Sequence, residues 1–211
     1  TEKGEAVVEV SSSYSLDRPR PLWVEIDPTL WWQAISETLQ QVLERSGVDS
    51  IDIVGVGIDA IGWTLIPVDK NINPLTPAMI WQDRRAEAET AWLNALPDAQ
   101  DLINLSANPI DAAYLTPKLL WLKKNRPKIF DATHRFLEAT GYIVAMFTNE
   151  YTCDYTQAYG YHFFDIRKEE WDQEKATKLG VPLEKMPRLC PSSEVVGEIT
   201  EKAAQETGLR Q

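Results

Sequence analysis

The chain has 211 residues, of which 44% are hydrophobic and 25% are charged. This composition suits one folded domain or one lobe of an enzyme, and it excludes a disordered chain and a machine of several domains. Lys and Arg number 21 against 32 Asp and Glu, so the formal net charge of −11 opposes binding to nucleic acid phosphates.

The sequence carries no signal for export, membrane insertion or metal binding. No apolar run approaches the roughly 18 residues of a membrane span, and no basic stretch followed by an apolar one opens the chain. The two cysteines, Cys153 and Cys190, have neither a zinc spacing nor a CxxC spacing. We therefore expect a cytoplasmic protein with reduced thiols, and neither nucleic acid nor a membrane as its partner.

The first part of the chain predicts strand, helix and strand. Apolar alternation over residues 5–10 predicts a strand, and because a strand must pair, we expect its partner to precede the chain. Asp27 and Pro28 are a cap and first residue typical of a helix, which apolar spacing extends to a stop at Gly47. Residues 51–57 are short, β-branched and mostly apolar, which predicts a buried central strand.

Strand and helix patterns continue to alternate along the rest of the chain. Further strands are predicted over 63–68 and 77–81, an extended segment over 195–199, and a turn over 69–74. Helices are predicted over 84–96, from a cap at Thr116 to Pro127, over 140–147, over 171–179, and from a cap at Thr200 to Gly208. This alternation predicts an α/β fold.

A glycine pattern over residues 55–60 resembles the dinucleotide-binding fingerprint G-x-G-x-x-G/A. That fingerprint requires a helix at its third position, whose N-terminus holds the pyrophosphate. Here a β-branched stretch containing Pro67 follows instead. The pattern therefore argues against a nicotinamide site, and the glycines more plausibly allow another backbone or a small ligand to approach closely.

Two residues stand out as candidates for a ligand site. Asp59 comes just past a predicted central strand, where ligands collect in α/β sheets, although a structural turn is the simpler explanation. Trp81 ends a predicted strand and is followed by four polar side chains, and tryptophan can stack on the apolar face of a sugar. Other aromatic and histidine residues are not candidates for the site. Tryptophans 31, 92, 121 and 171 fall on predicted amphipathic helices, where packing explains them. The histidines, His134 and His162, have no partners at the spacing of a triad or a metal site.

Several segments carry a distinctive pattern in a fixed order. These segments are 23–32, 51–57, 81–85, 116–122, the group formed by 154–158, 164–166 and Trp171, and 193–199. No single segment is decisive, but their order and spacing together are specific and extend over essentially the whole chain. Together they resemble the N-terminal lobe of the FGGY carbohydrate kinases, the family of xylulokinase, glycerol kinase, gluconokinase and ribulokinase.

The resemblance implies that residues 1–211 form an actin-like, ribonuclease H-like lobe of the ATPase superfamily that binds a sugar or polyol. It implies a second, ATP-binding lobe of the same protein, ATP and Mg²⁺ in the full-length enzyme, and no cofactor held by this chain alone. In this family a glycine-rich phosphate loop lies on a first hairpin, which would precede Thr1, and the catalytic base would follow Gln211. We therefore expect a fragment that is incomplete at the N-terminal hairpin, contains no catalytic residue and is inactive alone.

The family's substrate residues map onto this chain only in part. Trp81 matches a tryptophan that lines the polyol site of glycerol kinases. Asp59, Ala60 and Ile61 fall where xylulokinases have Gln-Met-His and glycerol kinases have Gln-Arg-Glu. Tyr114 lies beside the position of a substrate-contacting tyrosine and is expected to replace it. Because the Ile61 side chain can neither donate nor accept a hydrogen bond, we expect a substrate other than xylulose.

The activity that the resemblance implies is transfer of the ATP γ-phosphate to a sugar or polyol hydroxyl. Two other classes stay open at this point. A non-catalytic carbohydrate-binding module would explain the aromatic residues, although such modules are usually all-β. A nicotinamide-dependent enzyme would need a helix directly after Gly57. The oligomeric state is also open, with a homodimer as one alternative.

Overall fold

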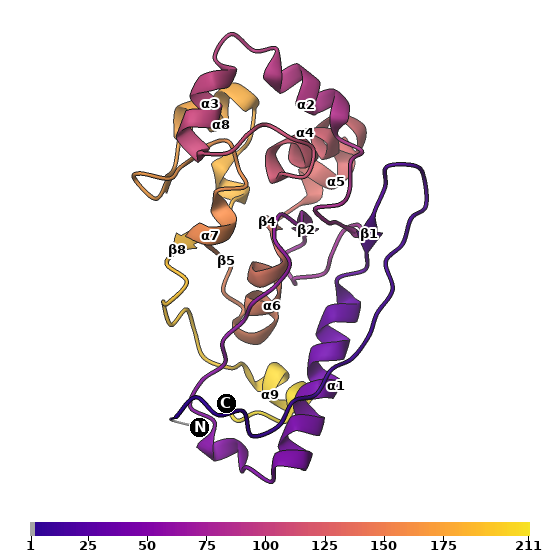
Figure 1. Ribbon diagram of the computed structural model, residues 1–211, viewed down its shortest axis with the longest axis vertical. Helices are drawn as coiled ribbons and strands as arrows, with labels where there is room; N and C mark the ends of the chain where they lie inside the picture. Colours follow the sequence, from indigo (N-terminus) through magenta and orange to yellow (C-terminus); the bar gives the residue numbers. More distant parts are fainter. Residues whose placement is uncertain (1–2) are drawn as a thin grey trace.

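The computed structural model describes residues 3–211, which fold as short strands between two groups of helices (Figure 1). One end contains α2 (Glu87–Asn94), α3 (Ala99–Ser106), α4 (Leu115–Asn125), α5 (Pro127–Ala132) and α8 (Gln173–Leu179). The other contains α1 (Thr29–Ser46) and α9 (Glu201–Thr207), with α6 (Ala139–Thr148) between the groups. Within the described residues, none of these helices combines the length and apolar character needed to span a bilayer.

Four short strands form the centre of the molecule. The strand β1 (Glu25–Ile26) pairs antiparallel with β3 (Ala78–Met79), and β2 (Ile66–Val68) pairs antiparallel with β4 (Arg135–Leu137). An antiparallel bridge between Leu65 and Met79 joins the two pairs. The strands therefore lie in the order β1, β3, β2, β4.

Alternating residues of these strands face two separate apolar cores, as the period of two in a strand requires. Leu65, Met79 and Phe136 belong to the core beneath α2 to α5, whereas Ile66, Ile80 and Leu137 belong to the core shared with α1, α6 and α9. All six of these side chains are buried. The central strands thus separate the two cores and hold both groups of helices in place.

Outside this centre lie two further strand pairs. The strand β5 (Thr152–Asp154) pairs in parallel with β8 (Arg188–Cys190), and β6 (Phe164–Asp165) pairs antiparallel with β7 (Glu170–Trp171). The short helix α7 (Tyr155–Ala158) and the 3₁₀ turns η1 (Ser50–Asp52) and η2 (Leu183–Lys185) complete the elements. The mixture of helices and strands agrees with the α/β class.

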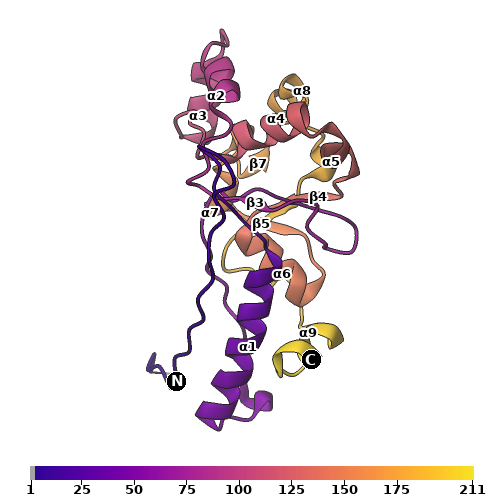
Figure 2. The same ribbon diagram turned by 90° about the vertical axis from the view of Figure 1, so that its right-hand side faces the viewer.

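The ends of two helices confirm the local sequence signals. The Asp27 carboxylate accepts the Thr29 N–H at 2.9 Å, and α1 ends at Gly47, whose φ of 65° is the left-handed conformation that glycine favours. Thr200 accepts the N–H of Ala203 at the start of α9. Figure 2 shows α1 running along the lower half of the molecule, with the N-terminal segment beside it.

Two predicted strands are wrong. Residues 5–10 join no β-ladder within residues 3–211, and residues 51–57 form η1 followed by extended backbone outside any described ladder. In that second segment Val54 is fully exposed rather than buried. A strand pattern specifies which face is apolar but supplies no hydrogen-bonding partner, and neither segment has a paired strand among the described residues. The extended segment 195–199 likewise joins no described ladder.

Two helix starts also differ from the prediction. Trp171 lies on β7, and α8 begins two residues later, where the Asp172 carboxylate accepts the Lys175 N–H at 2.8 Å. The helix α4 begins at Leu115, so Thr116 is inside it and is not its cap. The Thr116 hydroxyl instead accepts the backbone N–H of His162 at 2.8 Å.

We predict that Trp171→Ala lowers the free energy of unfolding by about 3 kcal/mol, because truncating this large, partly buried side chain leaves a cavity against the core. The Trp171 ring packs against the rings of Tyr161, Phe163 and Phe164 at centroid distances of 5.4 to 5.7 Å. The matched control is Trp92→Ala, since Trp92 is 51% exposed and its loss should change stability by no more than about 0.5 kcal/mol. Urea unfolding measures both variants, and equal midpoints would contradict the packing role of Trp171.

Candidate functional site

Three chain segments converge at one end of the central strand pair. The Asp59 segment (59–63) leads toward β2, and the Trp81 segment (81–85) follows β3. Because Leu65 and Met79 pair antiparallel, both segments lie at the same end of the pair. The Asp111 segment (111–114) precedes α4 and is joined to the other two by the contacts described next.

The Trp81 segment is fixed to β1 by a buried ion pair. The Asp83 carboxylate is fully buried and accepts the Val24 N–H at 2.7 Å. Asp83 also pairs with the Arg85 guanidinium at 2.7 Å, which in turn reaches Glu25 at 2.6 Å. The same guanidinium lies 3.6 Å from the centroid of the Trp23 ring. Asp83 and Arg85 are therefore structural residues of this turn.

A second ion pair joins the Trp81 segment to the Asp111 segment. Arg84 makes two parallel hydrogen bonds to Asp111, at 2.6 and 3.1 Å, and Asp111 also accepts the Ala113 N–H at 2.9 Å. Burial acts to raise the pKa of Asp111, but the Ala113 N–H and the Arg84 charge outweigh it and hold the pKa below its ordinary value. Asp111 is therefore a stable anionic anchor at neutral pH.

A buried lysine joins the Asp111 segment to the Asp59 segment. Lys118 is on α4, and its Nζ donates to the Trp63 carbonyl at 2.7 Å and to the Ala113 carbonyl at 2.6 Å. With the Leu65–Met79 bridge and the Arg84–Asp111 pair, this contact connects all three segments to one another.

Aromatic rings gather between the Asp59 and Asp111 segments. The ring of Trp63 lies 4.5 Å from that of Tyr114 and 5.8 Å from that of Tyr159, and Tyr114 lies 5.8 Å from the ring of His162. Burial, with the neighbouring Tyr159 and Asp111, raises the pKa of Tyr114, which stays protonated and able to donate a hydrogen bond. Trp63 was not predicted as a site residue, although its position two residues after Ile61 was a signal that could have identified it.

His162 is a neutral structural residue. Burial lowers its pKa to about 4, and its Nε2 lies 3.2 Å from the Pro109 carbonyl oxygen. It therefore carries no charge at neutral pH.

Asp59, Ala60 and Ile61 come together in one cavity. Its volume is about 310 Å³, and α1, α6 and residues 10–14 supply the other walls. Most of those walls are apolar, with Trp31 among them. Asp59 is exposed and brings a carboxylate to this cavity.

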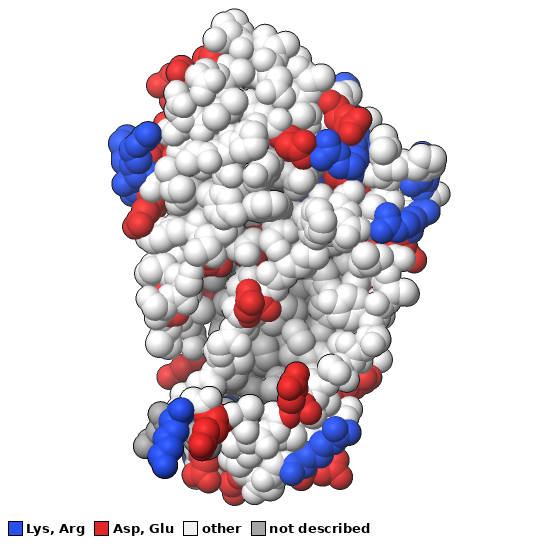
Figure 3. Space-filling view, in the orientation of Figure 1, with Lys and Arg blue, Asp and Glu red and all other residues white. Residues whose placement is uncertain are grey.

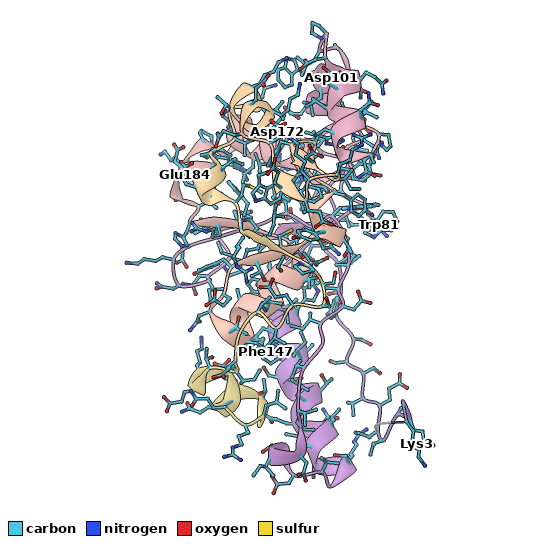
Figure 4. The ribbon with its side chains drawn as sticks, turned by 90° about the vertical axis from the view of Figure 1, so that its left-hand side faces the viewer. Lys3, Trp81, Asp101, Phe147, Asp172 and Glu184 are labelled. Atoms are coloured by element: carbon cyan, nitrogen blue, oxygen red, sulfur yellow. The ribbon has the colours of Figure 1, made fainter. Side chains whose placement is uncertain are left out.

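The Trp81 side chain lies apart from the aromatic rings of the site. It is 45% exposed, and Figure 4 shows it projecting from the edge of the molecule opposite Glu184. Among residues 3–211, its ring pairs with no other aromatic ring. The structure thus brings Asp59, Ala60 and Ile61 into one cavity and places Tyr114 against Trp63, while Trp81 stands free on the adjoining turn.

A second, larger hollow contains a buried carboxyl group that the sequence did not indicate. This cavity of about 700 Å³ lies between residues 53–58, the start of α6 and residues 190–199. Glu138 caps α6 by accepting the Gly141 N–H at 2.8 Å, and its other oxygen has no hydrogen-bond partner. Burial raises the pKa of Glu138 to about 8. The face in Figure 3 is hollowed below its centre, and acidic side chains lie at the edges of that hollow.

Two features of the described residues bear on the binding of a metal or a nucleotide. Within residues 3–211, no group of three or more His, Cys, Asp and Glu side chains gathers as a set of metal ligands. The turn at 55–60 leads into extended backbone and not into a helix, so it lacks the N–H groups that hold phosphates at a helix N-terminus.

The fold is that of an actin-like lobe as found in sugar kinases. The structure of xylulose kinase from Rhodospirillum rubrum superposes with a TM-score of 0.85 at 26% identity, covering 93% of this chain and 40% of that one. The structure of gluconate kinase from Lactobacillus acidophilus superposes with a TM-score of 0.84 at 24% identity, covering 99% and 42%. The second likeness supports the fold alone.

Sequence comparison places the chain in one family. The model of the FGGY family of carbohydrate kinases, N-terminal domain, matches residues 1–211, and the chain belongs to this family. It is 27% identical to the xylulose kinase of Escherichia coli, over 99% of this chain and 42% of that protein. It is 30% identical to the glycerol kinase of Thermococcus onnurineus, over 85% and 37%. The chain thus spans about two fifths of the length of these relatives.

We predict that the stability of the protein falls as the pH rises from about 4.5 to about 8, and that Glu138→Gln removes this dependence. Below pH 4.5 the Glu138 carboxyl is protonated in both states, whereas between its ordinary pKa of 4.5 and its folded pKa of about 8 only the unfolded chain releases the proton. Proton release therefore favours unfolding by about 4 to 5 kcal/mol at pH 8.

Urea unfolding at several pH values measures this difference. Glu184→Gln, at an exposed glutamate, is the matched control and should keep the wild-type profile. If the stability of Glu138→Gln follows the wild-type profile across this pH window, the Glu138 carboxyl group does not have the raised pKa that its burial implies.

Proposed function

We propose that this chain is the substrate-binding lobe of an ATP-dependent kinase that transfers the γ-phosphate to a hydroxyl of a sugar or polyol. The observation that carries the proposal is the convergence of the Asp59, Trp81 and Asp111 segments, which are joined by the Leu65–Met79 bridge, the Arg84–Asp111 ion pair and Lys118. Membership of a carbohydrate kinase family supports it. The xylulose and glycerol kinases among the relatives act on a sugar and a polyol, respectively.

The residues of the site have the chemistry that polyhydroxyl substrates require. In this proposal the exposed Asp59 carboxylate accepts hydrogen bonds from substrate hydroxyls, and the rings of Trp81 and Tyr114 pack against C–H groups. Asp111, Asp83 and their arginines are already paired with each other. They fix the geometry and leave Asp59 as the free acceptor. Phosphoryl transfer depends mainly on positioning and charge neutralisation, and this lobe supplies the positioning of the acceptor hydroxyl.

The remaining chemistry is assigned in this proposal to a second lobe of the same protein. That lobe would hold ATP with Mg²⁺, and the catalytic base would also lie outside these 211 residues. Two observations support an additional partner. The chain spans 42% of the length of the E. coli xylulose kinase, and the apolar segment 53–57 is extended and exposed with no strand beside it among residues 3–211.

A coupled ADP-release assay on the full-length protein tests the function. With a panel of pentoses, hexoses and polyols, we expect at least one substrate to give turnover far above the buffer blank. We expect D-xylulose not to be the best substrate, because Ile61 offers it no hydrogen bond and an unpaired buried hydroxyl costs about 1 to 3 kcal/mol. The 211-residue chain alone should give no turnover. Failure of every sugar and polyol with the full-length protein would refute the proposal.

We further predict that Trp81→Ala lowers kcat/KM for the best substrate about tenfold, because a lost stacking contact of about 1.4 kcal/mol corresponds to that factor. Trp92→Ala is the matched control, since Trp92 is also about half exposed but lies on α2, outside the three segments. Steady-state kinetics of both variants decide the matter. Equal effects of the two substitutions would remove Trp81 from the site.

A further inference from the structure

Lys118 is the one lysine among the described residues with no exposed surface, and it makes no ion pair. Its relative exposure is 0%, and no carboxylate within residues 3–211 lies within 4.0 Å of its Nζ. Its Nζ instead donates hydrogen bonds to two backbone carbonyls, those of Trp63 and Ala113. Burying an ammonium group without a carboxylate partner is costly, and an apolar side chain of similar length would avoid that cost. The arrangement therefore indicates that the two carbonyl contacts are what this lysine provides.

The charges around Lys118 act on its pKa in opposite directions. Burial lowers the pKa of Lys118 to about 7, the Asp83 and Asp111 carboxylates act to raise it, and the Arg85 and Arg84 guanidinium groups act to lower it. All four of these groups are already engaged in the ion pairs of the site. Lys118 thus lies at the centre of the network that joins the three segments.

The carbonyls that Lys118 holds belong to the Asp59 and Asp111 segments. Trp63 closes the Asp59 segment, and its φ of 55° is a left-handed conformation that a bulky residue rarely adopts without outside support. Ala113 directly precedes Tyr114 in the Asp111 segment. Lys118 therefore fixes the backbone at the two points from which the Trp63 and Tyr114 rings meet at 4.5 Å.

A glycine on the other side of Trp63 indicates that the position of this ring matters. A Cβ atom at Gly160 would lie 2.7 Å from Cδ1 of Trp63 and 3.0 Å from Cδ1 of Leu115. Gly160 is also anchored, because its carbonyl accepts the Leu115 N–H at 3.1 Å. The Trp63 ring is therefore held through its backbone by Lys118 and given room by Gly160.

We propose that Lys118 is a positioning residue for the sugar or polyol. It acts on the substrate only indirectly, by holding the backbone carbonyls of Trp63 and Ala113 in place. It sets the distance between the Asp59 and Asp111 segments, and thereby the fit of the substrate between them. This inference rests on the proposed function, and its expected signature is a loss of affinity for the sugar with little change in the use of ATP.

The test is Lys118→Met in the full-length protein, with Lys185→Met as the matched control. Lys185 also donates to two backbone carbonyls, those of Phe130 at 2.8 Å and Asp131 at 2.7 Å, but at the end of α5 and away from the three segments. Both variants should lose thermal stability. Lys118→Met should raise KM for the sugar at least tenfold, with KM for ATP changed less than twofold, and Lys185→Met should leave both values as in the wild type.

Gly160→Ala keeps Lys118 and displaces the Trp63 ring, so it tests the same geometry if Lys118→Met does not fold. It should also raise KM for the sugar selectively. An unchanged sugar KM in Lys118→Met, or in Gly160→Ala where the methionine variant does not fold, overturns the inference. A wild-type protein that phosphorylates no sugar or polyol overturns the proposed function instead, so the two failures are distinguishable.

Discussion

The site depends on two backbone hydrogen bonds. Leu65 N–H donates to the Met79 carbonyl at 3.1 Å, and Met79 N–H donates to the Leu65 carbonyl at 3.2 Å. This reciprocal pair joins β2 to β3 and brings the Asp59 and Trp81 segments to the same end of the strands. It also forms the boundary between the two apolar cores, because the next residue of each strand faces the opposite side. The site is therefore positioned by the same contact that divides the interior of the molecule.

Electrostatics divide the acidic residues of the site into two groups. Asp83 and Asp111 are satisfied by arginines and backbone N–H groups, so their charges hold the backbone in place. Asp59 is exposed at the mouth of an apolar cavity and keeps its carboxylate for a ligand. A protein with a net charge of −11 can thus offer a defined hydrogen-bond acceptor without adding an unpaired buried anion.

Features with a local cause could be predicted from the sequence, and features with a long-range cause could not. Asp27, Gly47 and Thr200 determine helix ends through their own neighbours, and the resemblance to the FGGY kinases correctly indicated the family and the fold. The strands predicted over 5–10 and 51–57 failed because pairing depends on a partner that the pattern does not encode. Lys118 was missed since a lysine in a helix ordinarily reaches solvent, and only the folded chain shows that the Trp63 and Ala113 carbonyls surround it.

The exposed segment around Val54 has a consequence for handling the protein. Extended apolar backbone without a ladder is a template on which copies of the same chain can stack edge to edge. The repulsion between molecules that each carry a net charge of −11 opposes such stacking. Aggregation of the purified chain then depends on salt concentration and on pH. Salt screens the repulsion, and acidification toward the isoelectric point of about 4.7 abolishes it. Dilute buffer well above that pH keeps the copies apart.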